Sequence, residues 1–272
     1  MGNKKRTISK KWLLLLISGL AILGIGIFLN HGEGALKGAA SGNDLYTGET
    51  GTQSVNGVNI FYETLGEGTP VILLHGNGGS HEDLFMEMEQ LAEAGYRVYA
   101  PDSRGQGKSS AAKEYHYHDM ADDVYELIRA WGLEKPALYG WSDGGIIGLL
   151  TEIRHPGTLG LLAVSGANIS PEGLEDSFLM PIRFISGNNG SLTDMIVNEP
   201  DISTQELASI QIPVLVTAGE RDIIKQEHTE MIAESIPNAE LMILEGEDHG
   251  SYIAGSPKMG EILLDFLRRN GM

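Results

Sequence analysis

From about residue 53 onward, short apolar runs alternate with amphipathic stretches whose apolar residues recur three and four positions apart. The runs are typical of buried strands and the stretches of helices. Strands are predicted at Pro70–Leu74, Tyr96–Ala100, Pro136–Gly140, Leu159–Ser165, Val214–Ala218 and Glu240–Leu244. Helices are predicted at His81–Ala94, His118–Trp131, Gly144–Arg154, Gln226–Ile236 and Pro257–Arg269. Wholly apolar strands between helices indicate an open α/β fold, with a mostly parallel, doubly wound sheet covered on both faces.

A hairpin is predicted at the start of this sheet. Ser54–Val55 and Val58–Leu65 have strand character and are separated by Asn56-Gly57. An Asn-Gly pair between strands favours a two-residue turn, because both positions need a positive φ. An antiparallel hairpin therefore leads into the parallel strands.

The alternation is interrupted between about residues 166 and 211, where no strand is predicted. A connection of this length is unusual inside a compact domain, so we expect a cap inserted over the carboxyl edge of the sheet. Ligands of open α/β sheets bind at that edge. The apolar cap residues are candidates for substrate binding, with packing onto the core as the alternative: Phe178, Met180, Ile182 and Phe184.

The N-terminus has a separate character. Eighteen residues without a charge, Trp12–Leu29, follow a cluster of basic residues, and about 27 Å of helix just crosses a bilayer. The basic flank predicts an uncleaved signal anchor over residues 1–30, a single pass with the body outside the cytoplasm. A signal peptide cleaved near Gly38-Ala39-Ala40, giving a secreted protein, is the alternative. Residues 31–52 are rich in Gly, Ser and Thr and predict a tether, so the folded domain is expected over 53–272.

Composition limits the chemistry. The chain has a formal net charge of −18 at pH 7, and five of its basic residues lie before residue 12. The body is therefore strongly acidic and should repel nucleic acid. The sequence contains no cysteine, which excludes disulfides, thiolate catalysis and cysteine metal sites.

A candidate nucleophile stands at the centre of the strand-turn-helix pattern of Leu138–Gly148. Ser142 lies between Gly140 and Gly144 in a G-x-S-x-G spacing. A serine on a tight strand-to-helix turn crowds the residues two before and two after it, so both must be very small. The turn would expose the Ser142 hydroxyl, and the Asp143 N–H at the helix N-terminus would stabilise negative charge.

A second donor for that charge comes from a glycine-rich loop. His75-Gly76-Asn77-Gly78-Gly79-Ser80 follows the strand that ends at Leu74. Its backbone N–H groups are accessible, and the Asn77 N–H is expected to pair with that of Asp143 in an oxyanion hole. A phosphate loop is the alternative, and the missing Lys-Ser/Thr pair argues against it. His75 is expected to be structural.

The base and the acid are expected after the last two strands. His249 follows the predicted strand Glu240–Leu244, and Asp222 follows Val214–Ala218. In the order serine, acid, histidine, His249 takes the proton of Ser142 and Asp222 fixes the tautomer of the histidine. Three nearby acids remain alternatives, as solvated or turn-forming residues: Glu220, Glu247 and Asp248. Three other histidines are expected to be solvated surface residues: His116, His118 and His228.

Five ordered segments resemble the α/β-hydrolase fold superfamily (the AB hydrolase-1 type) over about residues 54–270. They are HGNGGS, PDSRGQGKS, GWSDGG, GERD and GEDHG. The resemblance implies Ser142 as nucleophile, Asp222 as acid and His249 as base, with Asn77 and Asp143 as oxyanion donors. The PDSRGQGKS segment matches a loop that is chiefly structural in the superfamily, which implies no catalytic role for Arg104.

Around the nucleophile, Gly140–Ile147 and Ser165–Asn168 are similar to the valacyclovir hydrolase (biphenyl hydrolase-like) branch of that superfamily. In that branch the Asp after the nucleophile binds the α-amino group of amino-acid esters. The resemblance therefore implies a substrate-binding carboxylate at Asp143. Capping of the following helix by Asp143 is the alternative.

These observations favour a serine hydrolase that cleaves a carboxylic ester or related acyl bond and needs neither cofactor nor metal. The same triad serves cofactor-free perhydrolases or haloperoxidases and carbon–carbon bond hydrolases, so these remain alternatives. A non-catalytic ligand-binding module on the same scaffold is an alternative of another class. A nucleophilic Asp143 is disfavoured because Trp141 would then occupy a position that must be small.

Overall fold

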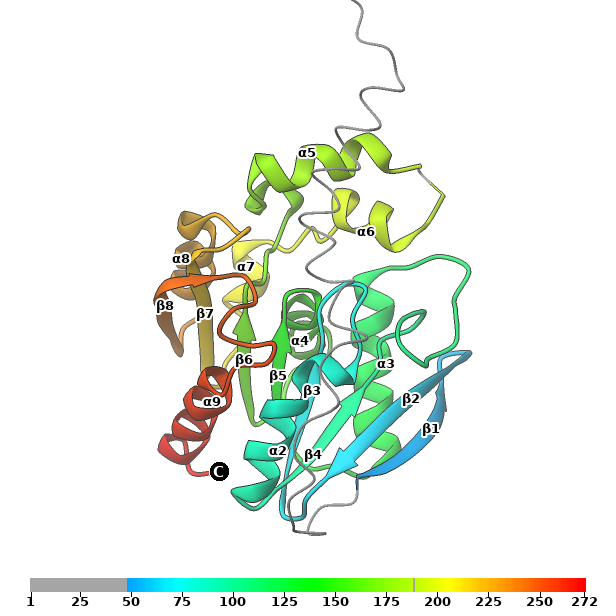
Figure 1. Ribbon diagram of the computed structural model, residues 1–272, viewed down its shortest axis with the longest axis vertical. Helices are drawn as coiled ribbons and strands as arrows, with labels where there is room; N and C mark the ends of the chain where they lie inside the picture. Colours follow the sequence, from blue (N-terminus) through cyan, green and yellow to red (C-terminus); the bar gives the residue numbers. More distant parts are fainter. Residues whose placement is uncertain (1–47, 188) are drawn as a thin grey trace, which may run out of the picture. The chain divides into compact units, whose positions relative to one another are not determined.

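The computed structural model describes residues 48–187 and 189–272, in which eight strands form one sheet (Figure 1). The strand order is β1-β2-β4-β3-β5-β6-β7-β8. β1–β2 and β2–β4 pair antiparallel, and every other neighbouring pair is parallel. The strands are β1 Glu49–Val55, β2 Val58–Leu65, β3 Thr69–Leu74, β4 Tyr96–Pro101, β5 Ala137–Trp141, β6 Leu161–Ser165, β7 Val214–Arg221 and β8 Ala239–Asp248.

Helices cover both faces of the sheet, as the alternating pattern predicted (Figure 1). α3 (Tyr117–Ala130), α4 (Asp143–Arg154) and α8 (Gln226–Ser235) pack in one apolar cluster with Ile72 and Leu74 of β3. α2 (Phe85–Glu93) and α9 (Lys258–Arg269) pack in another with Val71 and Leu73. Successive side chains of a strand point to opposite faces, so the two clusters lie on opposite sides. A short 3₁₀ turn, His81–Leu84, precedes α2.

The predicted hairpin is confirmed, with Val55 paired to Val58 and positive φ angles of 45° at Asn56 and 79° at Gly57. β1 nevertheless begins at Glu49, within the predicted tether, and the domain therefore starts before residue 53. The first residues of this edge strand are mostly exposed and carry no apolar side chain. Without a buried face they lack the alternation that marks a strand.

The segment between β6 and β7 is helical. It contains the 3₁₀ turn Pro171–Gly173 followed by α5 (Asp176–Ile185), α6 (Leu192–Asn198) and α7 (Thr204–Leu207). α5 and α6 lie beyond one end of the sheet (Figure 1). A bridge between Leu174 and Ile224, with a Glu175 N–H to Ile223 O hydrogen bond of 2.8 Å, joins the start of this cap to the loop after β7.

The predicted membrane segment, Trp12–Leu29, lies outside the described residues, as does the tether as far as residue 47. Within residues 48–187 and 189–272, none of the helices combines the length and the hydrophobicity that crossing a bilayer requires.

Glu87 of α2 is an acidic residue buried in the protein interior. It is 0 % exposed, and neither of its carboxylate oxygens has a hydrogen-bond partner among the described residues. Burial raises the pKa of Glu87 from about 4.5 to about 8, because an unpaired carboxylate is strongly disfavoured away from water. Glu87 is therefore protonated in the folded protein at neutral pH.

This protonation couples folding to pH. The unfolded chain releases the Glu87 proton above about pH 4.5, whereas the folded chain holds it to about pH 8. The contribution of the protonated Glu87 to stability is thus complete below pH 4.5 and is lost as the pH rises to 8.

We expect Glu87→Gln to raise the melting temperature by at least about 4 °C at pH 8.5 and by clearly less at pH 5.5. Exposed Glu89→Gln on the same helix is the control, and equal gains for both variants at both pH values would contradict the assignment.

Candidate active site

Ser142 lies at a strained turn between β5 and α4, with φ 55° and ψ −118°. The space around the turn explains the two glycines. A Cβ on Gly140 would lie 2.1 Å from the Gly144 carbonyl oxygen, and a Cβ on Gly144 would lie 2.2 Å from that of Leu74. Both contacts are with backbone, which cannot rotate away as a side chain can. The steric demand inferred from G-x-S-x-G is therefore present in the structure.

The structure brings Ser142, His249 and Asp222 together in one hydrogen-bonded chain. His249 Nε2 lies 3.0 Å from Ser142 Oγ, and His249 Nδ1 lies 2.6 Å from Asp222 Oδ1. The Asp222 side chain is 1 % exposed and also accepts hydrogen bonds from the N–H groups of Gly219 and Ile224. A buried carboxylate accepts from Nδ1–H, which leaves Nε2 as the acceptor for the serine hydroxyl.

The other acids near His249 have different partners. Glu220 accepts from the Gly246 N–H, and Glu247 pairs with Lys258. Asp248 accepts from the N–H groups of the two residues after His249, so it forms the turn that carries the histidine. Among the four acids considered from the sequence, Asp222 alone hydrogen-bonds the His249 ring in the described part of the chain.

Trp141, the residue before Ser142, also holds the His249 backbone in place. Its indole N–H donates to the His249 carbonyl oxygen at 2.9 Å, and its ring lies 5.9 Å from the imidazole ring. The residue that sequence reasoning used only to fix the motif register thus ties β5 to the histidine loop. The sequence could not predict this contact, because the acceptor of the indole N–H is a backbone carbonyl oxygen far along the chain.

The glycine-rich loop packs directly on the nucleophile turn. A Cβ on Gly76 would lie 3.2 Å from Ser142 Cβ. The Gly78 N–H donates to Gln106 Oε1 at 2.5 Å and the Gly79 N–H to Gly76 O at 3.2 Å. The Asn77 N–H has no acceptor within residues 48–187 and 189–272. A free backbone donor next to the serine is what an oxyanion hole requires.

His75 is structural, as expected. Its Nδ1 lies 2.7 Å from Gly76 O, and its Nε2 accepts from the Ser103 N–H at 3.0 Å. Burial lowers the pKa of His75, which keeps the ring neutral and fixes one tautomer.

The expectation that three other histidines are solvated is wrong for one of them. His228 Nε2 accepts from the Ile169 N–H at 3.0 Å, and burial lowers the pKa of the ring. The segment after β6 leads into the cap and has no strand beside it to pair with its backbone. His228 supplies the acceptor for one N–H group of that segment. His116 and His118 are exposed, and His116 pairs with Glu199.

The candidate substrate-binding residues of the cap differ in their surroundings. Phe178 is half-buried in an apolar cluster with Leu174, Leu179 and Ile224. Met180 and Phe184 are 63 % and 62 % exposed on α5. The cluster therefore joins the cap helix to the residues directly after Asp222.

The Asp143 side chain does not cap α4. Ser142 is the N-cap residue, and Asp143 is the first residue of the helix. Its Oδ2 accepts from Asn77 Nδ2 at 2.8 Å, and its Oδ1 accepts from the Tyr117 hydroxyl at 2.8 Å. The alternative of a helix cap is thus wrong, because both oxygens face other elements. Burial raises the pKa of Asp143, and the two hydrogen bonds oppose that shift.

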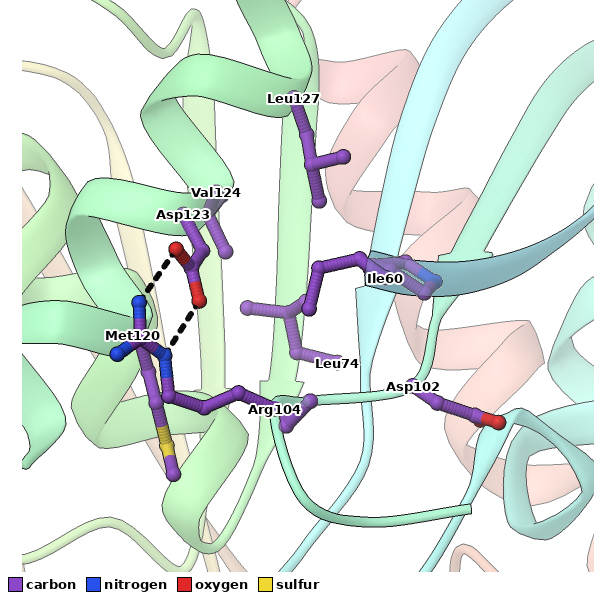
Figure 2. Close-up of a pocket in the computed structure, with 10 residues that line it drawn as sticks. Ile60, Leu74, Asp102, Arg104, Met120, Asp123, Val124 and Leu127 are labelled. Atoms are coloured by element: carbon purple, nitrogen blue, oxygen red, sulfur yellow. Dashed lines mark hydrogen bonds and ion pairs between the residues drawn. The ribbon is translucent and has the colours of Figure 1, made fainter. Parts of the chain in front are cut away.

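The Asp102–Ser109 segment is hydrogen-bonded to the glycine-rich loop through His75 and Ser103. Asp102 is 0 % exposed and accepts from the N–H groups of His81 and Lys108. Figure 2 shows Arg104 paired with Asp123, by two hydrogen bonds of 2.6 Å each. The cavity beside this pair measures about 10 Å³. This volume holds one water at most, and the pair of buried side chains ties the segment to α3.

The chain is similar to known proteins of the α/β-hydrolase fold. The family model described as alpha/beta hydrolase fold matches residues 69–185. The serine hydrolase BPHL of Homo sapiens is 26 % identical over 247 residues, covering 79 % of this chain and 85 % of that protein. The non-heme chloroperoxidase CPO-A1 of Kitasatospora aureofaciens is 27 % identical over 276 residues, covering 79 % of this chain and 98 % of that protein.

A solved structure has the same fold. The esterase EaEST of Exiguobacterium antarcticum superposes with a TM-score of 0.68, at 24 % sequence identity, over 82 % of this chain and 100 % of that one. At this identity the likeness establishes the fold, and the chemistry must be argued from the residues of this chain.

The glycines of the nucleophile turn provide a stability test. We expect Gly140→Ala to lower the melting temperature by at least about 10 °C, because the added Cβ meets backbone. The control is Gly148→Ala on α4, whose Cβ would meet methyl ends of Leu138 and Leu162 at 2.8 and 2.9 Å. Those side chains can move, so a loss below about 5 °C is expected. Thermal unfolding followed by circular dichroism measures both, and an undiminished melting temperature of Gly140→Ala would refute the steric account.

Proposed function

This chain is a hydrolase of the α/β-hydrolase fold superfamily, and from that premise we propose that it is a serine hydrolase that cleaves a carboxylic ester or related acyl bond. The observation that carries the proposal is the hydrogen-bonded order Ser142, His249, Asp222, with spacings of 3.0 and 2.6 Å. A serine within reach of an acceptor nitrogen, whose second nitrogen faces a buried carboxylate, is the arrangement that activates a hydroxyl.

In the first half-reaction, Ser142 Oγ attacks the acyl carbon while its proton passes to His249 Nε2. Asp222 orients the ring and stabilises the imidazolium that forms. Negative charge develops on the carbonyl oxygen and is met by the N–H groups of Asn77 and Asp143. Collapse of the tetrahedral intermediate breaks the bond to the leaving group, which receives the proton from His249. The acyl group remains on Ser142.

In the second half-reaction, water replaces the leaving group. His249 Nε2 takes a proton from the water as its oxygen attacks the acyl-enzyme, and then returns it to Ser142 Oγ as the carboxylic acid departs. His249 thus carries every proton that is transferred in the cycle, and the only other reactant is water. Apolar cap residues, Phe178, Met180 and Phe184, are the proposed contacts of the acyl chain.

A second candidate is favoured by one observation, the similarity to a protein named as a non-heme chloroperoxidase. In this reaction hydrogen peroxide replaces water in the second half-reaction, and the acyl group leaves as a peracid. The same triad carries both reactions. Measurement of peracetic acid formation beside ester hydrolysis separates them.

We further propose that the enzyme is held at the membrane by residues 1–30, with the catalytic domain outside the cytoplasm. The support is the uncharged run Trp12–Leu29, preceded by five basic residues. The proposed partners are thus a membrane and a small acyl substrate. The acidic body argues against nucleic acid.

The Ser142→Ala variant tests the chemistry. We expect kcat on p-nitrophenyl acetate and butyrate to fall by at least about 10³-fold, because no nucleophile remains for the acyl group. A fluorophosphonate probe should label the wild-type protein on Ser142 and leave the variant unlabelled. The control is Ser209→Ala, an exposed serine near α7, which should keep full turnover and labelling. Undiminished hydrolysis by Ser142→Ala would refute the mechanism, and an absence of hydrolysis and of labelling in the wild type would favour a ligand-binding module.

Fractionation tests the membrane proposal. We expect the full chain to sediment with membranes, to resist carbonate extraction and to dissolve in detergent. A variant lacking residues 1–30 should remain in the supernatant with its esterase activity intact, because the described domain begins near residue 48. Recovery of a shortened chain in the medium, with its N-terminus after Ala40, would show cleavage of a signal peptide and contradict the anchor.

A further inference from the structure

The side chain of Asp143 connects the two sides of the proposed oxyanion hole. Its backbone N–H is one proposed donor, and its carboxylate accepts from the side chain of Asn77, whose backbone N–H is the other. The Asn77 Nδ2 to Asp143 Oδ2 distance is 2.8 Å. One hydrogen bond thus links the loop after β3 to the first turn of α4. Hydrogen bonds to a carboxylate are shorter and stronger than neutral ones.

Tyr117 holds the same carboxylate from a third element. Its hydroxyl donates to Asp143 Oδ1 at 2.8 Å, and the residue is 2 % exposed at the start of α3. Burial, followed by the nearby charge of Asp143, raises the pKa of Tyr117 well above its ordinary value. The phenol therefore keeps its proton and remains a donor at every working pH.

Tyr117 is in turn fixed by the cap. Its N–H donates to Glu199 Oε2 at 3.0 Å, and Glu199 directly follows α6. The first residue of a helix has no acceptor for its N–H within the helix, so this bond satisfies an otherwise open donor. The Asp143 carboxylate is thus held by side chains from two elements, one of which is bonded to the end of the cap.

This arrangement bears on the substrate. An α-amino group would need a carboxylate open to the substrate, but Asp143 is 5 % exposed and each of its oxygens already accepts a hydrogen bond from the protein. A substrate ammonium would have to reach the remaining lone pairs of a carboxylate that is almost wholly covered, and would lose its own hydration there. Asp143 stands at the position to which the resemblance assigned amine binding, whereas in this chain both of its oxygens accept hydrogen bonds from the protein.

We propose that the Asp143 carboxylate is a positioning group for the oxyanion hole, which fixes Asn77 against the nucleophile turn and does not recognise a substrate ammonium. Resting on the proposed hydrolase function, this assigns the enzyme to esters that carry no obligatory positive charge near the acyl carbon. The Asp143 carboxylate acts through Asn77, while the Asp143 N–H contacts the substrate oxygen.

A double-mutant cycle tests the link. Asn77→Ala and Asp143→Ala each keep the backbone N–H and remove one side of the hydrogen bond. We expect each to lower kcat on p-nitrophenyl butyrate by about 10- to 100-fold with KM nearly unchanged, since the donor matters most as charge develops. The double variant should lose little more than either single variant, because both remove the same interaction. Losses that multiply would overturn the proposal.

Substrate selectivity supplies a second readout. The ratio of kcat/KM for an alanine ester to that for the propionate ester of the same alcohol should be the same in wild type and Asp143→Ala. A ratio that falls at least about tenfold in the variant, with propionate ester hydrolysis unchanged, would overturn the proposal in favour of amine recognition.

Tyr117→Phe should lower kcat on both esters together, with a smaller loss than Asp143→Ala. Tyr125→Phe, which removes a hydroxyl elsewhere on α3, is the matched control.

The hydrolase function and the positioning role of Asp143 are tested by different outcomes. Each variant is first shown to be folded by its circular dichroism spectrum, and wild-type turnover is shown to depend on Ser142. Wild-type protein without such turnover refutes the hydrolase function itself. Ser142-dependent turnover that survives unchanged in Asp143→Ala refutes only the positioning role.

Discussion

The close approach of three backbone segments at Ser142 is the constraint on which the rest of the site depends. With φ at 55°, the serine turns the chain from β5 into α4 within one residue. Gly140, Gly144 and the carbonyl of Leu74 meet at distances that leave no room for a Cβ. The hydroxyl is held outside the sheet as a result, and the N–H of the next residue begins a helix. Other residues of the site take their positions relative to this turn.

His249 and Asp222 reach Ser142 because parallel strands end at one edge of the sheet. β7 and β8 carry Asp222 and the His249 loop to that edge, and the Trp141 indole bonds the His249 carbonyl at 2.9 Å. The cap is attached at the same place, since Leu174 pairs with Ile224 two residues after the acid. The base of the cap is therefore joined directly to the loop that holds Asp222.

The sequence was informative where a local steric or periodic rule applies. Gly140 and Gly144 mark the turn, apolar runs mark the central strands, and the order of Ser142, Asp222 and His249 follows the strands that carry them. It was uninformative where the role of a residue depends on a hydrogen-bond partner far along the chain. Tyr117 lies 26 residues before Asp143, and nothing in its helical pattern distinguishes a buried phenol that donates from one that only packs. His228 and Glu87 were missed for the same reason, because side-chain periodicity reports which face is buried and not what lies against it.

Asp143 shows how far a motif can carry a function. A carboxylate after the nucleophile recognises an amine only if an oxygen is open to the substrate, and that depends on residues outside the motif. In this chain each carboxylate oxygen already accepts a hydrogen bond, Oδ2 from Asn77 in the loop after β3 and Oδ1 from Tyr117 of α3. The Tyr117 hydroxyl is buried, so giving up its hydrogen bond to Asp143 would leave a buried polar group unpaired. On the proposed function, the same residue type at the same motif position then serves the rigidity of the oxyanion hole, and the apolar surface of the cap is the proposed source of selectivity.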